Sequence, residues 1–247
     1  MSDDPLYVGA DWSSGSWVAV TFDREGYDHA DVFDEVGDLW LRYEERADRI
    51  LLDVPIGLVE DDAEGRQCEA LAREVLGPRR SSVFTPPVRE ATRKRRYPAA
   101  KRVNERKTGK SLSKQAFAIS DGIAAVDELL QEITEARDVI AEAHPEVCFR
   151  AFAGEPLEYS KRVAAGYAER MRTLAEYDRD APPVVQAAAE ATGGHDVAVD
   201  DVLDAVALAY TVRPGPGELR TLPPTPETDP TGLPMRMYYR AETPLGE

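Results

Sequence analysis

The chain has 247 residues, 43% of them hydrophobic, which is enough for one large domain with a full core. Its apolar runs are shorter than the roughly 18 residues of a membrane span. Its first residues are acidic and lack the basic and then apolar layout of a signal peptide, so we expect a cytoplasmic protein. Two cysteines and three histidines are too few for a disulfide framework, or for a thiolate or histidine-rich metal site.

Charge is distributed unevenly along the chain. Asp and Glu number 46 against 30 Lys and Arg, a net charge of −16, and only six of the basic residues are lysines. Such an acidic excess indicates a salt-rich cytoplasm, in which a self-repelling surface is screened. Residues 79–114 are the exception, because they contain 13 Lys or Arg and two Glu, including five of the six lysines.

The first third of the sequence predicts a small sheet. Apolar runs between turn residues indicate three strands joined by short turns, and therefore an antiparallel meander, at Leu6–Asp11, Ser16–Phe22 and Tyr27–Phe33. A short helix is expected at Glu35–Tyr43. The apolar run Arg49–Val54 ends at a carboxylate and a proline, which is typical of a buried parallel strand.

The remainder of the sequence predicts mainly helices. Helical spacing over Glu64–Leu76 ends at a Gly-Pro stop signal, and the basic segment after it, broken by prolines, is expected to be a loop or insertion at about 79–114. One long amphipathic helix, one strand and three further helices are then expected, at Ser113–Ala136, Asp138–Ala143, Ser160–Tyr177, Pro183–Thr192 and Asp201–Val212. Residues 214–247 form a Pro-rich tail that we expect to be mostly extended, with a terminal strand at Met235–Arg240.

This order of elements predicts the fold class. Three antiparallel strands continued by parallel strands, with helices on both faces, make a mixed α/β sheet. The order matches the ribonuclease-H-like architecture. We expect residues 1–213 to form one such domain, which carries the basic insertion.

Several carboxylates stand where predicted strands end. Asp11 closes the first strand and Asp53 closes the buried run, while Glu142 is the one charge in Val139–Ala143 and Glu146 follows shortly after it. An acid in an apolar strand is costly to bury unless it is paired or binds a cation. Ordinary explanations remain open, because Asp11 and Asp53 can cap turns and Glu142 can face solvent at a sheet edge.

The last predicted helix carries the acid that is hardest to explain structurally. Asp204 is the only charge from Val202 to Val212, and Asp201 lies three residues before it on the same helix face. Asp200 and Asp201 can serve as N-caps, but an apolar helix packed on a sheet would bury Asp204. Converging carboxylates need a cation, and Mg²⁺ or Mn²⁺ prefers such oxygen ligands and can promote phosphodiester hydrolysis as a pair of ions.

Several motifs together resemble the domain-of-unknown-function family 429. The most specific are GAD (9–11), DVPIGL (53–58), HPEV (144–147) and DVLDA (201–205), and the resemblance spans roughly residues 6–212. It implies a ribonuclease-H-like fold and a nuclease activity that is itself predicted for the family. The catalytic candidates are then Asp11, Asp53, Glu142, Glu146 and Asp204, and the candidate metal ligands are Asp11, Glu142, Asp201 and Asp204. The choice between Glu142 and Glu146 stays open, and Asp53 matches a family motif without an assigned role.

The basic segment predicts a polyanionic partner, DNA or RNA. Two alternatives are a solvated loop and an internal use, in which the arginines pair with the acidic body and hold the insertion down. The residues expected to bind nucleic acid are Arg79, Arg80, Arg93, Lys94, Arg95, Arg96, Lys101, Arg102, Asn104 and Lys161.

The leading functional hypothesis is a metal-dependent nuclease that uses carboxylates and two divalent ions. One alternative is a non-catalytic nucleic-acid-binding or nucleotide-binding module of the same fold. Another is an actin-like phosphotransferase, because Asp11-Trp-Ser-Ser-Gly between two strands resembles a hairpin that grips phosphate, although the sequence shows no second phosphate loop.

Overall fold

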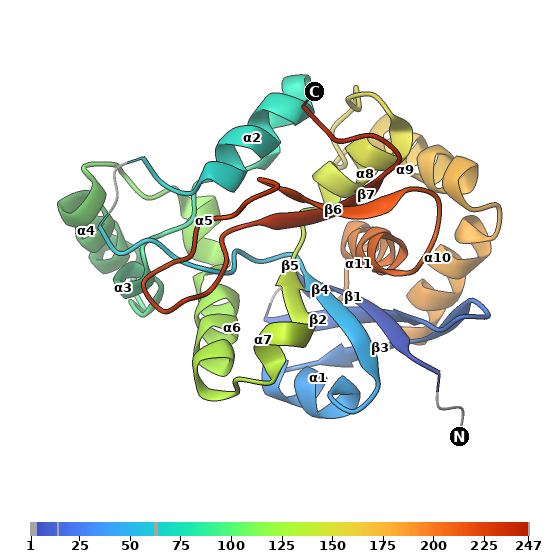
Figure 1. Ribbon diagram of the computed structural model, residues 1–247, viewed down its shortest axis with the longest axis horizontal. Helices are drawn as coiled ribbons and strands as arrows, with labels where there is room; N and C mark the ends of the chain where they lie inside the picture. The colour runs from blue at the N-terminus through green and yellow to red at the C-terminus, as the bar shows by residue number, and fades with distance from the viewer. Residues whose placement is uncertain (1–3, 14, 62–63, 247) are drawn as a thin grey trace.

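The computed structural model describes residues 4–13, 15–61 and 64–246, and its centre is a five-stranded mixed sheet with the strand order β3-β2-β1-β4-β5 (Figure 1). β1 (Leu6–Ser13), β2 (Ser16–Phe22) and β3 (Tyr27–Phe33) form the predicted antiparallel meander. β4 (Ala47–Leu52) pairs parallel with β1, and β5 (Ile140–Glu142) pairs parallel with β4. The expectation of an antiparallel meander continued by parallel strands is confirmed.

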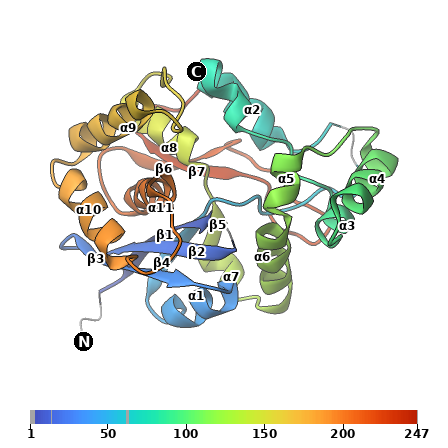
Figure 2. The ribbon, with the colours of Figure 1, turned by 180° about the vertical axis from the view of Figure 1, so that it is seen from behind.

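Helices cover both faces of this sheet, as Figures 1 and 2 show from opposite sides. One face is covered by α11 (Val199–Val212), around which α8 (Pro145–Ala153), α9 (Ala164–Tyr177) and α10 (Ala181–Ala191) pack. The other face is covered by α1 (Val36–Tyr43), α6 (Ser120–Glu132) and α7 (Ala136–Val139). Each face buries its own apolar cluster, so the sheet has no solvent-exposed side over its central strands.

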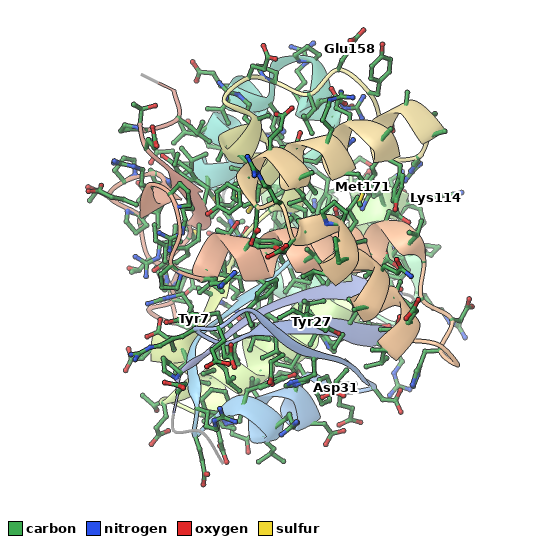
Figure 3. All side chains as sticks on the ribbon, turned by 90° about the vertical axis from the view of Figure 1, so that its right-hand side faces the viewer. Tyr7, Tyr27, Asp31, Lys114, Glu158 and Met171 are labelled. Carbon is green, nitrogen blue, oxygen red and sulfur yellow. The ribbon has the colours of Figure 1, made fainter. Side chains whose placement is uncertain are left out.

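The contact between α11 and β1 requires a residue without a side chain. A Cβ atom on Gly9 would lie 2.2 Å from the backbone nitrogen of Ala209 and 2.4 Å from the carbonyl oxygen of Ala205. α11 therefore lies directly on the strand, between the sheet and α9 (Figure 3, where Tyr7 and Tyr27 mark the sheet). This close approach fixes where the N-terminal turns of α11 meet the end of β1.

The basic segment is folded, which corrects the expectation of a loop. After α2 (Gln67–Leu76) it forms a 3₁₀ helix, η1 (Gly77–Ser82), and three α-helices, namely α3 (Arg89–Thr92), α4 (Tyr97–Thr108) and α5 (Lys114–Ala118). Its prolines do not prevent helices, because one of them stands in the first turn of α4, where no backbone N–H is needed. α3 and α4 extend from the sheet as a small lobe with its own apolar cluster (Figure 1).

The single long helix expected over Ser113–Ala136 is wrong, because it is divided into α5, α6 and α7. Ile119 leaves helical geometry with φ −103° and ψ 7°, and Ile133 is extended. The first break seats Gly122 beneath Trp12, where a Cβ atom would approach the indole to 2.9 Å. A tertiary contact with the end of β1 therefore overrides the continuous helical pattern.

The tail is more ordered than expected. β6 (Glu218–Leu222) and β7 (Met237–Ala241) form an antiparallel two-stranded sheet, whose apolar residues pack with α2 and α8. Asp229 accepts a hydrogen bond of 2.9 Å from the backbone N–H of Leu58 and ties the tail to the segment that follows β4. In the described parts of the chain, no helix has the length and apolar character needed to cross a membrane.

Candidate active site

Two acids lie side by side at the carboxyl ends of adjacent parallel strands. Ala10 pairs with Leu52, and the backbone N–H of Asp53 donates a hydrogen bond of 3.0 Å to the carbonyl oxygen of Ala10. Side chains alternate along a strand, so Asp11 shares the α11 face with Tyr7 and Gly9. The two carboxyl groups are close enough for each to shift the pKa of the other.

α11 brings a third acid to the same place. Asp204 is only 1% exposed, and its Oδ1 atom has no hydrogen-bond partner among the described residues. Its Oδ2 atom accepts a close charge-assisted hydrogen bond from the ammonium group of Lys161. One turn earlier, Asp201 accepts a hydrogen bond from the hydroxyl of Ser13 at the end of β1. We call Asp11, Asp53 and Asp204, with Lys161, the acidic centre.

The electrostatics of the acidic centre show an excess of buried negative charge. Burial, followed by the charges of Asp53 and Asp204, raises the pKa of Asp11 well above its ordinary value. Burial also raises the pKa of Asp53, and it raises the pKa of Asp204 to about 7, although Lys161 opposes both shifts. Burial disfavours the charged form of Lys161, but Asp204 and Asp11 outweigh that cost and hold its pKa above the ordinary value. One ammonium group is therefore too little positive charge for three carboxylates.

Glu142 lines the same cavity as Asp11, but its carboxylate is already bonded, and the catalytic and metal-binding roles expected for it stay predictions. Glu142 is in register with Leu52, whose side chain points to the α1 and α6 face, so it lies on the opposite side of the sheet from the acidic centre. There it accepts hydrogen bonds from Arg66, at 2.6 and 2.7 Å, and from the backbone N–H of Ile56, at 2.8 Å. Burial raises the pKa of Glu142 to about 8 despite the arginine.

Glu146 lies nearer to the acidic centre but already has a permanent partner. Arg170, which is fully buried, donates to both of its carboxylate oxygens, at 2.5 and 2.7 Å. The same guanidinium also donates to the carbonyl oxygens of Tyr159 and Gly166. Glu146 is therefore half of a hydrogen-bonded ion pair that connects α8 with α9, and neither Glu142 nor Glu146 is free to complete a metal site.

A second cluster of ligand-type side chains lies across the sheet, around Glu142. Within the described ranges, the ligand atoms of Cys68, Glu69 and Glu142 form the one group of three that all lie within 4.8 Å of one another. The Arg66 guanidinium already occupies this cluster, with its Nη2 atom 2.9 Å from the Cys68 sulfur and 3.2 Å from a Glu69 oxygen. Burial raises the pKa of the Cys68 thiol, which disfavours the thiolate that a metal needs. Arg66 therefore neutralises only part of this cluster, and both carboxylate oxygens of Glu69 are buried without a hydrogen-bond partner among the described residues.

The residues expected to bind nucleic acid fall into three groups. Arg80, Arg95, Arg96 and Arg102 are exposed and have no ion-pair partner in the described part of the chain. Arg93, Lys94 and Lys101 pair with acids of α3, α4 or α6, and Asn104 is buried and bonds the backbone of Val88 and Lys110. Arg79 and Lys161 line the cavity of the acidic centre.

A cavity of about 460 Å³ opens at the acidic centre. Trp12 and Phe84 contribute aromatic walls, and Arg79 contributes a guanidinium whose Nε atom is buried without a hydrogen-bond partner among the described residues. Sequence reasoning missed Trp12 and Phe84. It also assigned Lys161 to the nucleic acid rather than to Asp204. Lys161 is the only lysine outside residues 79–114, and its separate position in the sequence could have indicated a separate role.

The acidic centre offers the type of donor that a hard divalent cation takes, although the carboxylate oxygens of its three acids do not all lie within 4.8 Å of one another. All three acids offer oxygen ligands, which suits Mg²⁺ or Mn²⁺. The buried Oδ1 atom of Asp204, which has no hydrogen-bond partner among the described residues, indicates that positive charge is missing there. Asp201 lies at the rim, where its carboxylate is engaged by Ser13.

The fold and the site define an α/β protein with a carboxylate-lined cavity at the carboxyl edge of its parallel strands. The chain belongs to the family described as protein of unknown function (DUF429), whose model matches residues 9–228. The match includes every residue of the acidic centre. No curated protein and no solved structure matches the chain.

Proposed function

We propose that the chain is a metal-dependent phosphodiesterase that acts on DNA or RNA, with a sheet of the ribonuclease-H-like type. The observation that carries this proposal is the acidic centre, where Asp11, Asp53 and Asp204 meet on one face of the sheet. Burial first, and then the charges of neighbouring acids, raise their pKa values, an arrangement that a structural role would not need. The strand order β3-β2-β1-β4-β5, with an antiparallel meander continued by two parallel strands, supports the ribonuclease-H-like assignment.

The three acids would hold Mg²⁺ or Mn²⁺, and a bound ion of this kind supplies a Lewis acid that polarises a phosphate oxygen. The protein supplies the remaining contacts. Arg79 offers an unpaired buried N–H group in the cavity wall, suited to a phosphate oxygen. Trp12 and Phe84 offer faces on which a base can stack, a contact that does not depend on sequence.

The exposed arginines of the basic segment support a nucleic-acid substrate. Arg95, Arg96 and Arg102 lie on the α3–α4 lobe, and no ion pair within the described chain neutralises them. Exposed cations of this kind bind phosphates in a salt-dependent manner. We expect Arg95→Gln with Arg96→Gln to weaken binding of nucleic acid and to reduce its dependence on salt, without a change in the affinity for Mn²⁺.

Cleavage assays test the proposed function. Wild type, Asp11→Asn and Asp204→Asn are incubated with Mg²⁺ or Mn²⁺ on single-stranded, duplex and branched DNA and RNA. Asp138→Asn is the matched control. Asp138 is exposed and precedes β5, at the amino end of that strand, whereas the acidic centre lies at the carboxyl ends of the parallel strands. We expect cleavage by the wild type and the control, a loss of at least about a hundredfold in each site variant, and no cleavage in EDTA.

Other outcomes would favour the alternatives. Binding of nucleic acid without cleavage by any wild-type preparation would indicate a non-catalytic module. Turnover of ATP that Asp11→Asn abolishes would indicate a phosphotransferase. Cleavage that survives both Asp11→Asn and Asp204→Asn would overturn the assignment of the acidic centre.

A further inference from the structure

His144 belongs to the cavity of the acidic centre, although the proposed chemistry has not yet used it. It follows β5, and its partly exposed ring lines the cavity together with Asp53. After burial, His144 has the largest influence on the pKa of Asp53, which it lowers, so the ring lies close to that carboxyl group. His144 is therefore a neighbour of the proposed reaction site.

The ring is held in place by a hydrogen bond at one of its nitrogens. His144 is the N-cap of α8, and its Nδ1 atom accepts a hydrogen bond of 3.2 Å from the backbone N–H of Glu146. Pro145 has no N–H group, so Glu146 carries the first backbone donor of the helix that needs an acceptor. The bond uses the lone pair of Nδ1, so the proton of the neutral imidazole is on Nε2.

The other nitrogen is available to a ligand. In the described part of the chain Nε2 has no hydrogen-bond partner, and it is not one of the enclosed polar atoms, so it is open to the cavity that the ring lines. The nearby Lys161, in contrast, is already bonded to Asp204. A phosphate that enters this cavity meets carboxylates that repel it, so an unengaged N–H donor on the wall can decide how it is oriented.

We infer that His144 is a substrate-binding residue, whose Nε2–H group donates a hydrogen bond to a non-bridging oxygen of the phosphodiester. This inference rests on the proposed function and adds to it a group that orients the phosphate. Because the N-cap bond fixes the ring, the donor is in place before the substrate binds. A fixed donor of this kind contributes most where the phosphate oxygens gain charge during cleavage.

The alternative is that His144 serves only as the cap of α8. Two variants separate these roles, because Asn and Gln each reproduce one nitrogen of the imidazole. Asn is a good N-cap, whose Oδ1 atom can accept the bond from Glu146 in place of Nδ1, but it has no donor at the position of Nε2. Gln places an amide N–H group near the position of Nε2, but it is not among the preferred N-cap residues.

Cleavage with Mg²⁺ and melting temperature are measured for the wild type, His144→Asn, His144→Gln and the control His195→Asn, at an exposed position. We expect His144→Asn to melt like the wild type but to lose about a hundredfold in kcat/KM, the usual effect of removing one donor to a developing oxyanion. His144→Gln should melt at a lower temperature and yet retain more activity than His144→Asn. The control should match the wild type in both measurements. A folded His144→Asn that cleaves like the wild type would overturn the inference.

A second measurement depends neither on cleavage nor on the folding of a variant. ¹⁵N NMR of the three histidine rings in the wild type reports which nitrogen of each carries the proton. We expect His144 to be protonated on Nε2 alone, and this signal to shift when a short single-stranded DNA or RNA is added, with Ca²⁺ in place of Mg²⁺ to slow cleavage. A proton on Nδ1, or cleavage by the wild type with an Nε2 signal that no nucleic acid moves, would overturn the inference alone. A shifted Nε2 signal without cleavage of any substrate would overturn the proposed function alone.

Discussion

Replacing Asp11 with asparagine should stabilise the metal-free protein although it destroys the proposed site. Two unit charges 4 Å apart repel by about 4 kcal/mol at the effective dielectric constant typical of protein sites. Asn is nearly isosteric, and its amide can donate a hydrogen bond to the Asp53 carboxylate. Losing the attraction between Asp11 and Lys161 offsets part of the gain, so we expect a net increase of about 2 kcal/mol in the free energy of unfolding at pH 8.

The pH dependence gives the sign of the effect. In the folded protein the pKa of Asp11 is raised above 3.8, its ordinary value. At a pH between 3.8 and this raised pKa, the folded protein therefore binds more protons than the unfolded chain. The stability of the wild type therefore falls as pH rises through this window, whereas Asp11→Asn should show a shallower fall. Urea denaturation in EDTA at pH 5 and pH 8 measures both effects. Added Mn²⁺ should stabilise the wild type more than the variant.

A lower stability of Asp11→Asn at pH 8 would refute this reasoning. It would mean that the Asp11 carboxylate contributes a favourable bond to the fold, and that the acidic centre is not a region of unneutralised charge. Asp138→Asn, measured in parallel, should differ from the wild type by no more than about 0.5 kcal/mol, because that side chain is exposed.

Two further variants test the scaffold of the site. Gly9→Ala should lower the free energy of unfolding by about 3 kcal/mol or more, because its Cβ atom would lie within 2.4 Å of backbone atoms of α11. The control is Gly37→Ala in α1, where no atom lies in reach of the new Cβ. Chemical denaturation should show this control to be neutral or slightly stabilising. Arg170→Met should cost about 3–5 kcal/mol because it leaves Glu146 buried without its partner. The exposed control Arg172→Met should cost less than about 0.5 kcal/mol, and equal effects of the two arginine variants would contradict the buried pair.

Much of the sheet could be predicted because its signals are local. The short turns between the first three strands allow only an antiparallel meander, and the apolar run before Asp53 indicates a strand covered on both faces. Asp204 could also be singled out, since one charge in an otherwise apolar helix must be buried with a partner.

The features that escaped prediction depend on contacts between distant segments. The face on which Glu142 lies follows from its register with Leu52, and a three-residue strand carries no periodicity from which that register could be read. The break at Ile119 follows from the packing of Gly122 under Trp12, more than a hundred residues away in sequence. The helices of the basic segment depend on the small apolar cluster that their own prolines and charges conceal.

The partners of the acids separate structural carboxylates from those available to a ligand. Glu142 and Glu146 each accept hydrogen bonds from a buried arginine, a residue that stays charged and offers several donors. Asp11, Asp53 and Asp204 share one lysine on a side chain that solvent can reach. Buried acids without a matching permanent cation cost stability, and a protein retains such a cost where a bound cation recovers it. No arginine in the described part of the chain bonds Asp11, Asp53 or Asp204, and this argues for function there as much as the presence of the acids does.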